Sequence, residues 1–132
     1  MRLFVADAPS GDWSELTDGG QRTVRVAASD LQQARRARTR IRARDEDVAM
    51  ILDITVAVAG DFRSARIVLG QADHTVHYAG TVEGLAGLIS DIAKADVADG
   101  VTLISASPGQ DLRTLGHDVL HRLASLDQPK AS

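Results

Sequence analysis

A carboxylate and a guanidinium stand on adjacent predicted strands of this sequence. Residues 48–59 form an apolar, β-branched run that predicts a central parallel strand, and Asp53 is the only charged residue within it. The preceding strand, predicted over residues 23–27, carries Arg25. A buried carboxylate finds a partner or changes its pKa, so we expect Asp53 to pair with Arg25. Two interpretations stay open: a structural ion pair, or a carboxylate that faces a ligand.

Strand alternation divides residues 48–59 between two faces of the sheet. One face is wholly aliphatic and suits packing against helices. The other carries Asp53, Thr55 and small residues, so it is the face on which chemistry is expected. Thr55 has a second interpretation as an ordinary strand hydroxyl with its hydrogen bonds satisfied.

Ligands of barrels and open α/β sheets bind where parallel strands end. Ser105 follows the strand predicted over residues 101–104, and Gly80-Thr81 opens a predicted helix whose apolar residues recur at intervals of three and four. The backbone N–H groups and positive end of that helix predict an anion site at Gly80 and Thr81. The alternative is that Thr81 only caps the helix.

Histidine and cysteine give little support for metal chemistry. His117 and His121 are four residues apart with Asp118 between them, which is metal-ligand spacing without the glutamate arrangement of a zinc protease. The chain has no cysteine, so thiol nucleophiles and thiolate metal sites are excluded. We therefore predict no metal site.

Composition and charge argue against nucleic acid and membranes as partners. The net charge is −3 and aromatic residues make up 3% of the chain, which disfavours binding to nucleic acid. No apolar run approaches the roughly 18 residues of a membrane span, and the N-terminus does not resemble a signal peptide. We expect a cytoplasmic protein without membrane contact.

One predicted helix, from about residue 29 to residue 44, is rich in arginine. Acidic residues flank it on both sides. The pattern favours a solvated helix face, with a phosphate or partner site as the alternative. The arginines of this segment are Arg35, Arg36, Arg38, Arg40, Arg42 and Arg44.

The remaining pattern predicts one α/β domain spanning residues 1–132. Four strands are predicted, at residues 3–6, 23–27, 48–59 and 101–104. They alternate with helices, which is typical of βαβ units with right-handed crossovers. Smaller predictions are a helical turn through Trp13 and Leu16, a helix over residues 61–69, a connector at 71–79, a final helix over 112–123 and a frayed tail at 127–132.

Three segments in order carry a family resemblance: Tyr78-Ala79-Gly80-Thr81, then Asp99-Gly100-Val101-Thr102-Leu103-Ile104, then Val119-Leu120-His121-Arg122-Leu123. Together with the strands and helices before them, from about Thr23, they resemble the C-terminal half of luciferase-like flavin-dependent monooxygenases. The resemblance implies four parallel strands alternating with helices, as in half of a (β/α)₈ TIM barrel. A complete barrel takes about 250 residues.

The resemblance also implies a function and an assembly. It implies an oxidoreductase module that binds FMN or a deazaflavin, with the phosphate near Gly80 and Thr81; the catalytic residues stay unknown. A half-barrel would expose its polar face and two strand edges, so we expect a homodimer. An open sandwich with helices on both faces is the structural alternative. The functional alternative is a noncatalytic dimer that binds a small ligand or stabilises a partner. The other residues placed around the pocket are Arg25, Asp53, Thr55 and Ser105.

Overall fold

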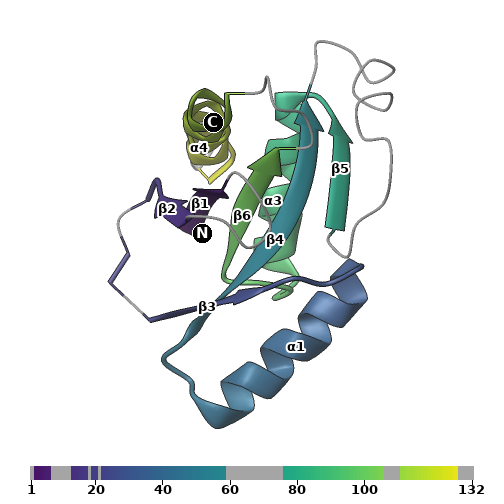
Figure 1. Ribbon diagram of the computed structural model, residues 1–132. Coiled ribbons are helices and arrows are strands. Elements are labelled where there is room, and N and C mark those ends of the chain that lie inside the picture. The colour runs from purple at the N-terminus through teal and green to yellow at the C-terminus, as the bar shows by residue number, and fades with distance from the viewer. Residues whose placement is uncertain are drawn as a thin grey trace, which may run out of the picture.

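A curled sheet of six strands, resembling half of a barrel, organises the protein (Figure 1). The computed structural model describes residues 2–6, 13–17, 19–20, 22–58, 76–105 and 111–127. Strands β3 and β5 share one edge of β4, because β3 pairs with the first half of β4 and β5 with its second half. In sheet order the strands are β2 (Trp13–Glu15), β1 (Arg2–Ala6), β6 (Gly100–Ser105), β4 (Ala49–Val58) and β3 (Thr23–Val26), with β5 (Val76–Gly80) beside β4.

The four predicted strands are confirmed as β1, β3, β4 and β6, and they run parallel to one another. The prediction of a purely parallel, four-stranded sheet is wrong, because β2 is antiparallel to β1 and β5 is a further strand. Trp13 lies in β2 opposite Ala6 rather than in a helical turn. A single helical turn gains few hydrogen bonds, whereas β2 satisfies the backbone of an edge strand.

Residues 76–79 form most of β5 and not a connector. The reason lies in the length of β4, which has ten residues, while β3 pairs with only Ala49 to Leu52. The backbone groups of the second half of β4 need partners along the same edge. Strand β5 supplies them, in register from Ile54 to Val58.

Three helices are described: α1 (Leu31–Arg44), α3 (Val82–Lys94) and α4 (Leu112–Asp127). Asp30 caps α1 by accepting a hydrogen bond from the Gln33 N–H at 2.8 Å, as Ser, Thr, Asp and Asn do at helix starts. Helix α4 continues to Asp127, the first residue of the predicted frayed tail. The rest of that tail and the helix predicted over residues 61–69 lie outside the described residues.

All three described helices pack against the same face of the sheet. Their buried residues form one apolar cluster with β-strand residues that include Leu3, Leu52, Ile54 and Leu103, each fully buried. Burying an aliphatic side chain of this size stabilises the fold by about 1.5–3 kcal/mol. For the described helices, the sandwich with helices on both faces is therefore wrong, and the half-barrel arrangement holds.

The amino ends of β4 and β6 are held together by Asp99. Its carboxylate accepts hydrogen bonds from the Met50 N–H at 2.8 Å, from Arg38 Nη2 at 3.0 Å and from Arg42 Nη2 at 2.8 Å. Burial alone would raise the pKa of Asp99, but these donors together lower it below its ordinary value. Two arginines of α1 thus anchor the helix to the sheet.

Candidate functional site

The residues that could do chemistry gather on the helix-free face, meaning the sheet face that none of the three described helices covers. Successive side chains of a strand point to opposite faces of the sheet, so every second residue of β4, counted from Asp53, lies on this face. Residues of the neighbouring strands that are in register with these positions lie on the same face. Phe4, Thr102 and Asp53 form one row across β1, β6 and β4. Arg25 is in register with Ile51, two residues before Asp53 along β4, and Thr55 is two residues after Asp53.

Asp53 pairs with Arg25, as the sequence predicts. The Arg25 Nε donates to Asp53 Oδ1 at 2.7 Å, and the Asp53 side chain is only 3% exposed. Burial is the dominant influence and raises the pKa of Asp53 above its ordinary value. Hydrogen bonds from Arg25 and Thr102 act in the opposite direction and favour the carboxylate. The arrangement is a nearly dry ion pair at the middle of the sheet.

Trp13 completes this cluster, which we call the brace: Trp13, Arg25, Asp53 and Thr102. The indole Nε1 donates to Thr102 Oγ1 at 2.7 Å. Its ring stacks on Phe4 with centroids 4.2 Å apart, and the Arg25 guanidinium lies 5.7 Å from the Trp13 ring centroid. Sequence reasoning did not include Trp13 in the site. The available signal was that it is the only tryptophan in a chain of few aromatics.

The carboxyl half of the same face carries a second set, which we call the carboxyl-end patch: Thr55, Ala57, His77 and Ala79. Thr55 is in register with His77, and Ala57 with Ala79. His77 and Ala79 are half-buried, whereas Thr55 and Ala57 are buried. The patch therefore joins a polar row to a row of small side chains. His77 was missed because the segment was interpreted as a connector, in which strand alternation assigns no face.

The predicted site residues do not form one compact site. Arg25 is in register with Ile51, and Gly80 with Val58, seven positions farther along β4, which corresponds to about 23 Å. Ser105 is in register with Val56, so it lies on the face that the helices cover. The structure brings Arg25, Asp53 and Thr55 onto one face but separates them from Ser105, and it places Gly80 and Thr81 at the far end.

Thr81 acts as the N-cap of α3. Its Oγ1 accepts the Gly84 N–H at 3.2 Å, and its carbonyl accepts the Tyr78 hydroxyl at 2.8 Å. Burial raises the pKa of Tyr78, which keeps the phenol protonated as a donor. Glu83 adds a carboxylate to the first turn of α3, which opposes an anion at this helix end. The capping interpretation is thus the one that the hydrogen bonds support.

Burial on the helix-free face differs from the expectation of an exposed polar face. Asp53, Thr55 and Thr102 are 2%, 4% and 0% exposed in the single chain. A lone half-barrel was expected to expose its polar face, but these three groups are buried in the single chain. Within the brace, Trp13 donates to Thr102 and Arg25 donates to Asp53. A second copy is therefore not required to remove them from water.

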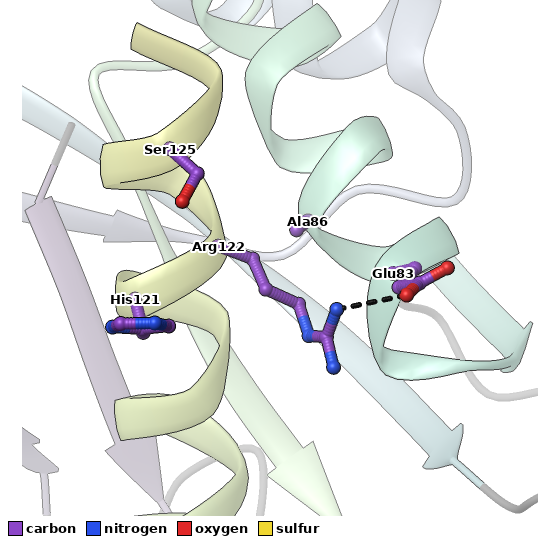
Figure 2. Close-up of a pocket in the computed structure, with 5 residues that line it drawn as sticks. All are labelled: Glu83, Ala86, His121, Arg122 and Ser125. Atoms are coloured by element: carbon purple, nitrogen blue, oxygen red, sulfur yellow. Dashed lines mark hydrogen bonds and ion pairs between the residues drawn. The ribbon is translucent and has the colours of Figure 1, made fainter. Parts of the chain in front are cut away.

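A separate hollow lies between α3 and α4 on the opposite side of the sheet (Figure 2). It has a volume of about 550 Å³. Arg122 reaches across from α4 to Glu83 on α3, with Nη1 2.9 Å from the carboxylate, and its Nε lies 3.5 Å from Asp118. The charged groups of this hollow thus neutralise one another. Its lining residues are Glu83, Ala86, His121, Arg122 and Ser125.

His117 and His121 lie on the exposed surface of α4. Within the described ranges, no group of three or more histidine, aspartate or glutamate side chains is arranged to hold a metal ion. No described helix combines the length and the apolar character that crossing a bilayer requires.

Comparison with known proteins identified no relative of this chain among protein families or curated proteins.

Proposed function

We propose that this chain is a luciferase-like oxidoreductase module and that its carboxyl-end patch contributes to a site for FMN or a deazaflavin. The observation that carries the proposal is the patch itself, where the Thr55–His77 row borders the small side chains of Ala57 and Ala79 on the helix-free face. Small residues let a planar ring approach the strands, and the half-buried His77 gives the border of the patch a polar character. Ligands of parallel α/β folds bind at this end of the strands.

The brace has a supporting role in this proposal. It lies in the amino half of the sheet, and its polar atoms bind one another, so it fixes the position of β4 and β6 without contacting the ligand. The flavin would supply the redox chemistry, and the protein would supply binding and orientation. Thr81 caps α3, which packs on the opposite face of the sheet, and is not assigned a direct role.

A titration with FMN tests the proposal, and Ala79→Leu is the decisive variant. A leucine at this position covers the floor of the patch and leaves the brace intact. We expect Ala79→Leu to weaken FMN binding at least about tenfold, which is about 1.4 kcal/mol. Ala93→Leu makes the same substitution at an exposed position of α3 and should bind FMN like the unmodified chain. The emission of Trp13, the only tryptophan, reports whether each variant is folded.

Equal FMN affinity in the Ala79 and Ala93 variants would contradict the assignment of the patch. Failure of the unmodified chain to bind either FMN or a reduced deazaflavin at about 1 mM would contradict the flavin function as a whole.

A noncatalytic homodimer is the second candidate function. The mutual pairing of Trp13 with Thr102 and of Arg25 with Asp53 favours the noncatalytic part of this candidate, because a face whose polar groups are satisfied needs no ligand. The dimer is expected from the unpaired strand edges of a half-barrel. This candidate predicts a colourless protein of twice the chain mass by light scattering, with no response to FMN. A monomer under the same conditions would exclude it.

A further inference from the structure

Three exposed arginines recur every fourth residue along α1, and we call them the arginine stripe: Arg36, Arg40 and Arg44. Residues four apart lie on one face of a helix. Two adjoining hollows follow the stripe, of about 280 Å³ and 200 Å³, and Arg40 lines both. Figure 1 shows α1 beside β3 at one margin of the molecule, away from α4.

The floor of these hollows is apolar. Ala37 contributes to both, Ile41 to the smaller one, and Val26 and Ala28 to the larger one. Val24, on the adjacent strand β3, is 39% exposed, the large apolar side chain most open to solvent in the described part of the chain. An apolar strip with a cationic border thus extends over three turns of helix.

Arg36, Arg40 and Arg44 differ in their ion pairs from Arg38 and Arg42 of the same helix. Arg38 and Arg42 are paired with Asp99, whereas no carboxylate of the described ranges forms an ion pair with Arg36, Arg40 or Arg44. Like charges four residues apart repel one another and lower helix stability. Arg44 gains from the negative end of the helix, but Arg36 and Arg40 are too far from it. An anionic partner would relieve this repulsion.

We propose that the arginine stripe and its hollows bind an amphipathic acidic helix of a partner protein. Apolar residues of such a helix, spaced by three and four, would enter the hollows, and its carboxylates would pair with Arg36 and Arg40. A phosphate polymer would pair with the arginines but would leave the apolar floor of the hollows without a partner. A second copy of the chain, placed by twofold symmetry, would set this stripe against itself and add repulsion.

A synthetic peptide serves as the probe. A fluorescent helical peptide of about 18 residues, with leucine on one face and glutamate on the other, is titrated with the full chain and followed by anisotropy. The double variant Arg36→Glu/Arg40→Glu should lose at least about tenfold in affinity. It should instead bind the peptide in which lysine replaces glutamate.

Arg35→Glu/Arg113→Glu is the matched control, because both arginines are exposed, neither lines the hollows, and the net charge changes equally. Equal losses in the two double variants would overturn the proposal, since they would reflect net charge alone. Binding of a leucine-free glutamate peptide, or of single-stranded DNA, as tightly as the amphipathic peptide would also overturn it.

Backbone NMR shifts of the unmodified chain provide an independent test. Changes confined to α1 and β3 support the site, and changes elsewhere refute it.

Discussion

Replacing Arg25 by methionine tests the physical basis of the brace. The substitution keeps the length and apolar packing of the side chain but removes the partner of Asp53, whose side chain is 3% exposed. Breaking a buried ion pair costs about 3–5 kcal/mol, because the remaining charge stays desolvated. The Arg25 side chain is 17% exposed, so water partly reaches the site and the lower end, about 3 kcal/mol at pH 7, is expected.

The loss should depend on pH in a defined direction. Burial already holds the pKa of Asp53 above its ordinary value of 3.8, and removal of Arg25 raises it further. A carboxyl whose folded-state pKa is raised binds a proton that the unfolded chain releases, so stability falls as pH rises from 3.8 through the folded-state pKa. The cost of Arg25→Met should therefore shrink toward about 1 kcal/mol as the pH is lowered from 7 to about 4, because protonation of Asp53 removes the unpaired buried charge.

Urea denaturation followed by far-ultraviolet circular dichroism measures these free energies. In the double variant Arg25→Met/Asp53→Asn the buried charge is gone, and the loss at pH 7 should fall to about 1–2 kcal/mol, below that of Arg25→Met alone. Arg113→Met, at an exposed position of α4, is the control and should change stability by less than about 0.5 kcal/mol. A double variant as unstable as Arg25→Met, or a loss that is the same at both pH values, would refute the reasoning.

Three further substitutions test the elements that support the sheet. Asp99→Asn should cost about 2 kcal/mol at pH 7 in urea denaturation. Because the pKa of Asp99 is lowered, its contribution is present above pH 3.8 and is lost as pH falls through the folded-state pKa, so a cost that does not shrink as the pH is lowered below 3.8 would contradict it. Thr81→Ala should lower the free energy of unfolding by about 1 kcal/mol, with Thr81→Ser near neutral, and equal losses would exclude the capping role. Gly100→Ala should destabilise the protein by about 1–3 kcal/mol, because the new Cβ would lie 2.6 Å from the Arg2 carbonyl oxygen. Gly87→Ala, in open space on α3, should instead raise the melting temperature. A Gly100→Ala variant more stable than the Gly87→Ala variant would contradict the packing described around β6.

Local sequence patterns were sufficient for the elements that form the core. The β-branched run of β4 and the capping residue Thr81 specify their elements through neighbouring residues alone, and both are found where predicted. Strands β2 and β5 escaped prediction because each is held by an edge that another strand leaves unpaired. That edge is a property of the assembled sheet, not of residues 13–15 or 76–80.

The candidate site was predictable only in part for a related reason. Alternation along β4 correctly placed Asp53 and Thr55 on the face opposite the helices. The distance between Arg25 and Gly80 depends on how β3 and β5 divide the edge of β4, which no local pattern encodes. Ser105 was predicted to follow β6 and to lie beside the pocket, but β6 extends one residue beyond its predicted end. Ser105 is therefore in register with Val56, on the face that the helices cover.

Asp53 and Asp99 show how the number of donors decides the state of a buried carboxyl group. Both lose solvation in the sheet, yet their pKa values shift in opposite directions. Asp99 receives a backbone N–H and two guanidinium groups, which outweigh burial, whereas Asp53 has one guanidinium and one hydroxyl, which do not. Asp99 therefore stabilises the fold toward neutral pH, and Asp53 makes the brace dependent on Arg25.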